Sequence, residues 1–232
     1  MKPSAPSGIL FLVATPIGNE DDLTFRALKT LKSVDVVVYE ERREGERLLA
    51  RLGITPAIVE QLNEHNEERG AGLIVQYLRE GKNVALVSDA GTPVLADPGH
   101  LLVEKAIAHA ITVVPLPGAS SILPALTASG FATHHFLYYG FLSPKTEHRL
   151  EELRLVRNEE RTMIFMDTPY RLVQLLRDMT EVFGPDRRVC VAFNITMKDE
   201  KFYRDAVGTL LKHFAGLDVK GEFVVVAEGA GR

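Results

Sequence analysis

The sequence lacks the features that mark secreted and membrane-spanning proteins. Its 232 residues include one cysteine, Cys190, so no disulfide can form within the chain and a reducing cytoplasm fits. No apolar run is long enough to span a bilayer, and the short polar start over residues 1–7 lacks the apolar core of a signal peptide. We therefore expect a cytoplasmic protein without membrane contact, in which Cys190 packs in a strand instead of acting in catalysis.

An excess of positive charge and the common nucleotide-binding loops are also missing. The formal net charge is −4, whereas an unspecific nucleic-acid binder is usually basic overall. Neither GxxxxGK[ST] nor a GxGxxG after the first apolar strand occurs, which removes the commonest phosphate loops. The seven histidines do not have metal-ligand spacing, and the adjacent pair His134 and His135 would point to opposite faces of a strand. We expect no metal site.

What the first half does contain is an alternation of short apolar strands with amphipathic helices. We expect strands at residues 9–14, 34–39, from Val84 onward, and 112–116. Helices are expected at residues 24–31, 45–52, 67–78 and 101–110. Mostly apolar strands are typical of a parallel sheet that is covered on both faces. The pattern predicts a doubly wound α/β sheet in this half.

The second half has a different residue pattern, with more aromatic and charged segments. Residues 136–141 read as an aromatic-rich strand, and further strands are expected at 162–166, 188–193 and 222–227. A small-residue helix is expected at 120–129, and a highly charged one at 145–158, which we interpret as a solvated face. A stiff segment with two prolines lies at residues 115–118, and we place the domain boundary near residues 117–120. We therefore expect two α/β domains, 1–118 and 119–232, since 46% hydrophobic residues suffice for two cores.

Residues 84–99 are the most informative stretch. An apolar run ends abruptly in a turn that offers the Asp89 carboxylate, the Thr92 hydroxyl and the Gly91 backbone. In parallel sheets, ligands bind beyond the carboxyl ends of the strands. Other polar loops that follow predicted strands lie at residues 15–18, 40–43, 118–121 and 167–170. We expect these loops to line one crevice that suits a neutral or cationic small cofactor, because few lysines are present for a triphosphate.

Several of these segments together resemble one family. They are residues 14–19, 64–67, 84–93, 97–99, 115–118, 129–130, 140–142 and 221–222. The combination is similar to the ribosomal RNA small subunit methyltransferase I group of the tetrapyrrole methylase superfamily. The resemblance implies two α/β domains of the tetrapyrrole methylase type, S-adenosylmethionine in the cleft between them, and a homodimer. It also implies methyl transfer to the 2′-hydroxyl of a cytidine in 16S rRNA of the 30S subunit.

The resemblance assigns the cofactor to particular loops. Asp89 is the natural hydrogen-bond acceptor for the amino-acid end of the cofactor, and the strand near Gly221 would close over it. By match of motif, the residues lining the cofactor are Pro16, Ser88, Asp89, Ala90, Gly91, Thr92, Pro93, Ser120, Ser121, Phe165 and Met166.

A ribose hydroxyl is a poor nucleophile, so a base or cation near it assists the reaction. The sequence offers Glu40, Glu41, Arg42, His65 and Lys145. We favour Glu40 or Glu41 as the catalytic residue, because both follow the second strand close to the expected cleft. Arg42, Arg43 and Lys145 are candidates for binding the acceptor, since guanidinium groups hold phosphates well.

Three segments depart from the family pattern. Residues 39–43, 166–171 and 193–197 differ from it, and the last segment has Phe193, Asn194 and Met197 where the family has Arg, Glu and Lys. The methyl donor is therefore better supported than the acceptor. Two alternatives stay open: a precorrin-type tetrapyrrole methylase, for which the low positive charge argues, and a shorter, catalytically silent cofactor-binding paralogue, which the altered residues 193–197 motivate.

Overall fold

The computed structural model describes residues 7–217 and 220–231, and the chain divides into two units, Met1–Ser120 and Ser121–Arg232. Each unit has its own sheet and its own hydrophobic core. In the described ranges, no helix is both long enough and apolar enough to cross a bilayer.

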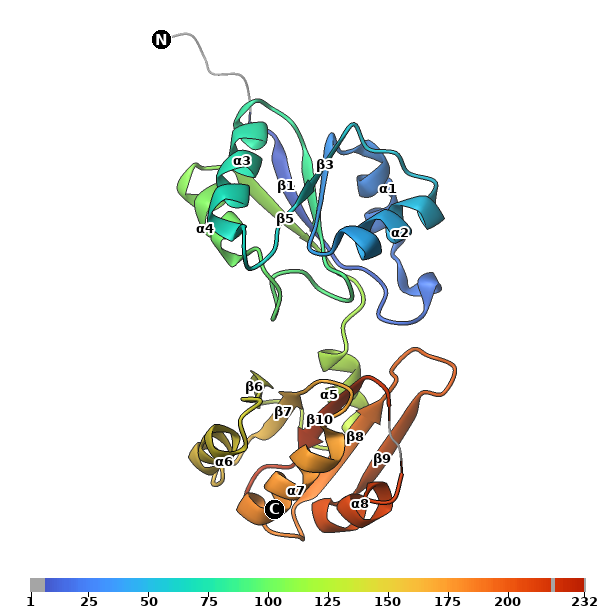
Figure 1. Cartoon of the computed structure of the whole chain (residues 1–232), viewed down its shortest axis with the longest axis vertical. Helices are drawn as coiled ribbons and strands as arrows, with labels where there is room; N and C mark the ends of the chain where they lie inside the picture. The colour runs from blue at the N-terminus through green and yellow to red at the C-terminus, as the bar shows by residue number, and fades with distance from the viewer. Residues whose placement is uncertain (1–6, 218–219, 232) are drawn as a thin grey trace. The chain divides into compact units, whose positions relative to one another are not determined.

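The first unit is built on five parallel strands (Figure 1). Their order across the sheet is β3-β2-β4-β1-β5, and neighbouring strands keep one register, as in Leu12 beside Leu86 and Val37 beside Ala85. The predicted doubly wound parallel sheet is confirmed. The strands are β1 (Ile9–Val13), β2 (Val36–Tyr39), β3 (Ile58–Gln61), β4 (Val84–Val87) and β5 (Thr112–Leu116).

Helices cover both faces of this sheet, which explains why its central strands β1, β2 and β4 are almost entirely apolar. The helices α1 (Phe25–Ser33) and α2 (Arg42–Leu52) pack on one face through Leu31 and Leu49, and α3 (Glu67–Arg79) and α4 (His100–Ala108) on the other through Leu78 and Leu102. A short 3-10 helix, η1 (Glu20–Asp22), precedes α1. The Thr24 hydroxyl caps α1 by accepting from the Ala27 N–H, and α2 ends at Gly53, which has a left-handed conformation.

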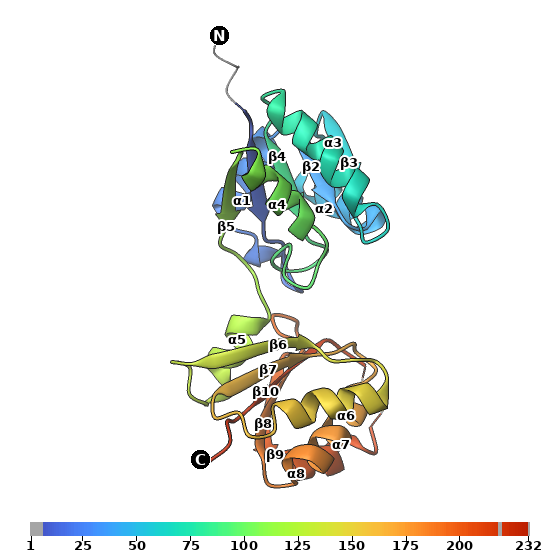
Figure 2. The ribbon, with the colours of Figure 1, turned by 90° about the vertical axis from the view of Figure 1, so that its left-hand side faces the viewer.

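The second unit contains a mixed sheet in the order β6-β7-β10-β8-β9 (Figure 2). Among the neighbouring strands of this sheet, only the pair β6 and β7 is parallel. Strand β10 lies antiparallel between β7 and β8, so β8 runs in the same direction as β6 and β7, and β9 pairs antiparallel with β8. The carboxyl ends of β6, β7 and β8 and the start of β10 therefore share one edge. The strands are β6 (Phe136–Phe141), β7 (Thr162–Met166), β8 (Arg188–Phe193), β9 (Lys201–Ala206) and β10 (Phe223–Ala227).

Three helices, α6 (Thr146–Leu155), α7 (Leu172–Phe183) and α8 (Val207–Phe214), join one core with this sheet. Helix α5 (Ile122–Ser129) lies against β8, β9 and β10. The sequence patterns did not predict β3, α7, β9 or α8. Strands β3 and β9 are edge strands with mixed polarity, so they lack the continuous apolar run by which the central strands were found.

The structure corrects one expectation about the charged helix. Arg149 of α6 is only 1% exposed, although this helix was expected to be a solvated face. Its Nε lies 2.6 Å from Asp178 Oδ2 of α7, and its guanidinium also donates to the Ser143 carbonyl at 2.9 Å. A buried charge with this many partners is a packing element between two helices.

The expectation that Cys190 packs in a strand is confirmed. Cys190 lies buried in β8, and burial raises the pKa of its thiol to about 11.

Candidate functional site

The carboxyl edge of the first sheet gathers four of the five loops that the sequence identified. All five strands are parallel, so residues 15–18, 40–43, 88–93 and 118–120, which follow β1, β2, β4 and β5, lie along the same edge. Residues 167–170 follow β7 and belong to the second unit. The expectation of one shared edge thus holds within the first unit for four loops.

The loop after β4 is tied to its neighbours by several hydrogen bonds. Thr15 and Gly91 exchange backbone hydrogen bonds of 2.9 and 3.0 Å, which joins this loop to the end of β1. The Thr92 hydroxyl donates to the Ala119 carbonyl at 3.2 Å. Ser88 is buried, and its hydroxyl donates to Asp97 Oδ2 at 2.5 Å, so that this side chain shapes the loop. Asp89 and Ala90 remain exposed at the tip.

This loop also contains unusual backbone. Val94 has φ +74° and Ala96 has φ +64°, values that non-glycine residues seldom adopt, and Val94 is β-branched. Each such residue costs on the order of 1–3 kcal/mol and persists only where the surroundings enforce it. Residues 88–99 are therefore a strained loop that is held in shape by its contacts.

Carboxylates crowd the middle of this edge. Burial, followed by the negative charges of Asp97 and Asp89, raises the pKa of Glu40 to about 7. Burial is also the main reason that the pKa values of Asp89 and Asp97 are raised, and a hydrogen bond from the Glu41 N–H to Asp89 at 3.3 Å opposes the shift in Asp89. A carboxyl group with a pKa near neutrality can take up or release a proton at physiological pH.

The other predicted polar residues of this edge lie at the start of α2. Glu41 is the exposed N-cap residue of α2, and its side chain accepts no hydrogen bond from the first N–H groups of the helix. Arg42 is also exposed, and its Nε lies 2.7 Å from Glu46 one turn further on. Arg43 is exposed as well. Of the two glutamates that the sequence left open, Glu40 is half-buried among other carboxylates, whereas Glu41 faces solvent.

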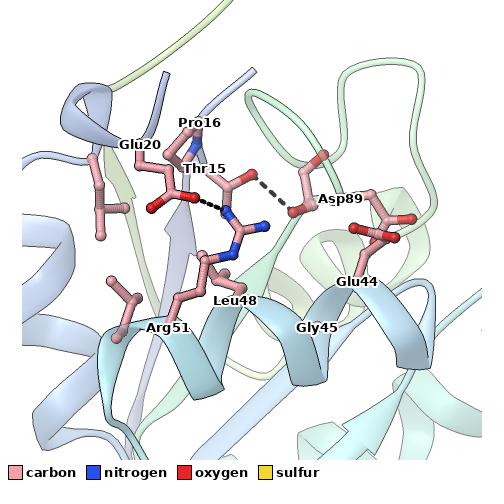
Figure 3. A pocket seen from close by; sticks show the side chains of 11 residues that line it. Thr15, Pro16, Glu20, Glu44, Gly45, Leu48, Arg51 and Asp89 are labelled. Carbon is pink, nitrogen blue, oxygen red and sulfur yellow. Dashed lines mark hydrogen bonds and ion pairs between the residues drawn. The ribbon is translucent and has the colours of Figure 1, made fainter. Parts of the chain in front are cut away.

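A pocket opens beside this edge, between η1, α2 and the end of β4 (Figure 3). Figure 3 shows Glu20 paired with Arg51 on one side, and Asp89 and Glu44 on the other. The Thr15 hydroxyl donates to the Ser88 carbonyl at 2.9 Å and holds the back of the pocket together. Because Glu20 already neutralises Arg51, the remaining carboxylates favour a ligand group that is cationic or donates hydrogen bonds. The lining residues are Thr15, Pro16, Glu20, Leu23, Glu44, Gly45, Leu48, Arg51, Leu52, Ser88 and Asp89.

Three residues that the resemblance assigned to the cofactor, Pro16, Ser88 and Asp89, line this pocket. Sequence patterns did not identify its other lining residues or the effect of the Asp97 charge on Glu40. The signal for the pocket was weak: Leu48 and Leu52 have helical spacing on α2, but nothing in the sequence shows that η1 lies opposite them. Asp97 lies in an Asp-Pro-Gly turn that the sequence matched to the family without assigning it a role.

The candidates in the second unit lie near the edge where β6, β7 and β8 end. Met166 is half-buried at the end of β7, and its sulfur accepts a hydrogen bond from the Tyr138 hydroxyl at 3.3 Å. Phe165, by contrast, is 0% exposed and packs its ring on Tyr139 at 5.5 Å between centroids. The side chain of Phe165 therefore belongs to the core, so a role for Phe165 at the cofactor would involve its backbone. Lys145 is exposed at the N-cap of α6.

Ser120 and Ser121 lie where the two units meet in sequence. Both are half-buried, and Ser121 is the N-cap residue of α5 without a side-chain cap. Ser120 is the last residue of the first unit and Ser121 the first of the second. Of the predicted cofactor residues, therefore, those up to Ser120 belong to the first unit, and Ser121, Phe165 and Met166 belong to the second.

The altered segment 193–197 is tightly built. Asn194 has φ +48° and Thr196 has φ +68°, and Asn194 is buried with its Nδ2 donating to Asp199 at 2.6 Å. The Asn194 N–H donates to the Glu222 carbonyl at 2.8 Å, which joins this segment to the chain before β10. A Cβ on Gly221 would collide with the side chains of Phe193 and Asn194, so glycine is required there. The segment is an ordered part of the second unit despite its departure from the family pattern.

Comparisons with known proteins agree with this geometry. A match to the family described as Tetrapyrrole (Corrin/Porphyrin) Methylases covers residues 10–211. A protein of Bacillus subtilis (strain 168), named ribosomal RNA small subunit methyltransferase I, is 41% identical over 96% of this chain and 76% of its own length. The protein of the same name from Synechocystis is 41% identical over 96% of this chain and 80% of its own length.

Solved structures show the same fold at lower identity. A diphthine synthase matches 96% of this chain and 90% of its own with a TM-score of 0.76 and 16% identity. The uroporphyrin-III C-methyltransferase of Thermus thermophilus complexed with S-adenosyl homocysteine matches 95% of this chain and 97% of its own with a TM-score of 0.64 and 20% identity.

Proposed function

The chain is a methyltransferase that belongs to the tetrapyrrole methylase family, and from that premise we propose that it transfers a methyl group from S-adenosylmethionine to the 2′-hydroxyl of a cytidine in 16S rRNA. The relatives that carry the rRNA name are about twice as similar in sequence as the solved tetrapyrrole methylases. One observation supports the catalytic part of this proposal: the Glu40 carboxyl group lies at the carboxyl edge of a parallel sheet and has a pKa of about 7.

The residues of this edge fit the cofactor. Asp89 is an exposed carboxylate that accepts a hydrogen bond of 3.3 Å from the Glu41 N–H, and its remaining acceptor positions can receive hydrogen bonds from the cofactor's ammonium group. The pocket next to it offers carboxylates and apolar leucine side chains, which suits a ligand with a positive charge and an apolar body. S-adenosylmethionine supplies an activated methyl group when it is bound.

The protein's own part in the reaction is alignment and proton removal. Methyl transfer is an in-line displacement, so holding donor and acceptor in near-attack geometry can lower the barrier by up to about 7–11 kcal/mol. Glu40 in its deprotonated form accepts the proton of the ribose hydroxyl, and its raised pKa gives it the basicity for this step. Arg42, Arg43 and Lys145 are exposed and hold phosphates of the acceptor strand.

Transfer of labelled methyl groups tests the proposal directly. Purified protein is incubated with tritiated S-adenosylmethionine and 30S subunits that lack the modification, and the label is mapped after nuclease digestion. We expect label at the 2′-oxygen of one cytidine. Binding of S-adenosylmethionine by calorimetry, with transfer to neither 30S subunits nor naked 16S rRNA, would contradict an rRNA acceptor. Label on a precorrin-type substrate in the parallel arm would identify a tetrapyrrole methylase instead.

The proposal extends to assembly and location. We propose a homodimer in the cytoplasm, as the family resemblance implies and as a single buried cysteine allows. Light scattering on the purified protein would give a mass near twice the 25.7 kDa of the chain, and a mass of one chain at micromolar concentration would contradict this part.

A further inference from the structure

The segment Asn63–Glu67 matches the family pattern, yet no step of the proposed reaction uses it. Its two asparagines build the turn between β3 and α3. Asn63 Oδ1 accepts from the N–H of His65 at 3.1 Å, Asn66 Oδ1 accepts from the N–H of Asn63 at 2.8 Å, and Asn66 Nδ2 donates to the Gln61 carbonyl at 2.9 Å. The turn is therefore locked, and it places Glu67 as the first residue of α3.

Glu67 reaches from α3 to the start of a different helix. Its Oε1 accepts from the N–H of Gly99 at 2.8 Å and from the N–H of Leu101 at 3.3 Å. Gly99 is the N-cap residue of α4 and has no side chain that could cap the helix. The first N–H groups of a helix need acceptors, and a carboxylate also interacts favourably with the positive end of the helix dipole. Glu67 thus caps α4 from outside.

Gly99 is also the last residue of the strained loop that carries Asp89 and Gly91. Its own φ is +121°, and an added Cβ would lie 2.8 Å from Leu86 of β4, so the chain passes close to the sheet here. Within the loop, Val94 and Ala96 hold left-handed conformations, and the Ser88–Asp97 hydrogen bond closes it on itself. Such a loop keeps its shape only if its ends are held. The backbone bridge between Thr15 and Gly91 holds the first part of the loop, and Glu67 holds its last residue, Gly99.

We propose that Glu67 is a positioning residue for S-adenosylmethionine: by accepting from the Gly99 and Leu101 N–H groups, it holds residues 88–99 in the shape that presents Asp89 and Gly91 to the cofactor. The inference rests on the proposed function, because it takes that loop as the cofactor site. It assigns a task to the first residue of α3, which lies about twenty residues before the loop in the sequence.

The test compares three variants at two adjacent glutamates, Glu67 and Glu68. Glu67→Ala removes both hydrogen bonds, and we expect the Kd for S-adenosylmethionine to rise by about tenfold to a hundredfold, as for the loss of charge-assisted hydrogen bonds. Glu67→Gln keeps a neutral acceptor at the same place and is expected to raise the Kd by about threefold. Glu68→Ala is the matched control, because Glu68 is exposed and pairs with Lys105 at 2.5 Å. Its Kd should equal that of the parent protein.

A merely structural role predicts a different outcome. It would lower the melting temperature of Glu67→Ala without changing the Kd measured well below that temperature. A positioning role predicts a raised KM for S-adenosylmethionine with an unchanged KM for 30S subunits. It also predicts faster hydrogen exchange at residues 89–101 in Glu67→Gln, a readout that remains available if Glu67→Ala does not fold. An unchanged Kd in folded Glu67→Ala, or unchanged exchange and Kd in Glu67→Gln, overturns the inference. Failure of the parent protein to bind S-adenosylmethionine would overturn the proposed function instead.

Discussion

At the scale of single residues, the chemistry of this protein depends on how burial changes a carboxyl group. Glu40 and Glu41 are neighbours in sequence, yet Glu40 ends a strand among other carboxylates and Glu41 starts a helix in solvent. The pKa of Glu40 is raised to about 7 because the charged form is poorly solvated and is repelled by Asp97 and Asp89. This difference is the reason that we propose Glu40, and not Glu41, as the base.

Replacing Glu40 by glutamine should therefore lower kcat by about 100-fold to 10,000-fold, the usual contribution of a general base. The base acts in its deprotonated form, so the rate of the parent protein should rise as the pH passes 7 and then level off. Glu40→Gln should lose this rise and keep its affinity for S-adenosylmethionine. Glu41→Gln serves as the comparison and should retain the pH profile. A profile that rises equally in both variants would exclude Glu40 as the base.

The same substitution should change stability in a pH-dependent way. The pKa of Glu40 is higher in the folded protein than its ordinary value of 4.5, so the folded state is destabilised relative to the unfolded state as the pH rises from 4.5 through 7. Glu40→Gln has no charge to lose its solvation, so its free energy of unfolding above pH 7 should exceed that of the parent by about 1 kcal/mol, a value reduced for solvent screening. Urea unfolding at pH 5 and at pH 8 should show a difference between variant and parent that grows with pH; a constant difference would contradict the shifted pKa.

At the scale of elements, close packing decides which substitutions the helices tolerate. In α2, a Cβ on Gly45 would collide with the ring of Tyr39 in β2, whereas a Cβ on Gly72 of α3 would meet open space. Both glycines lie inside helices, but only the position of Gly45 lacks space for a side chain.

Gly72→Ala should stabilise the protein by about 0.5–1 kcal/mol, because alanine is the better helix former and meets no obstacle. Gly45→Ala should instead destabilise it by about 1–3 kcal/mol, because the helix must move away from the sheet. Free energies of unfolding in urea compare the two directly. Stabilisation by both substitutions would show that α2 does not pack as closely on Tyr39 as described.

Helices α6 and α7 are joined by a buried ion pair, Arg149 with Asp178, and by an exposed one, and the two pairs should differ in their contribution to stability. Asp178→Ala leaves Arg149 charged and buried, which should cost about 3–5 kcal/mol. Arg154 and Glu181 link the same two helices on the surface at 3.6 Å, and Glu181→Ala should cost less than about 1 kcal/mol. Thermal unfolding measures both. Equal losses would mean that Arg149 finds water or another partner when Asp178 is removed.

At the scale of the whole molecule, each of the two units has its own sheet and core, but the proposed cofactor residues are divided between them. Residues 1–120 and 121–232, expressed separately, should each unfold cooperatively in denaturant, since each buries an apolar core of its own. Neither should bind S-adenosylmethionine with the affinity of the whole chain, because each lacks part of the proposed set. Calorimetry that finds full affinity in residues 1–120 alone would place the whole cofactor site in that unit.

The sequence by itself determined the parallel sheet of the first unit, the motif set of the family and the loops that follow its strands. Apolar strands and Gly- or Pro-containing turns are local signals, so they can be read without knowing the fold. Only the tertiary structure decided which glutamate is buried, that Phe165 and Arg149 lie in the interior, and that Glu67 caps a helix 32 residues away. Burial, pKa and long-range hydrogen bonds depend on which segments lie side by side, and no local pattern carries that information.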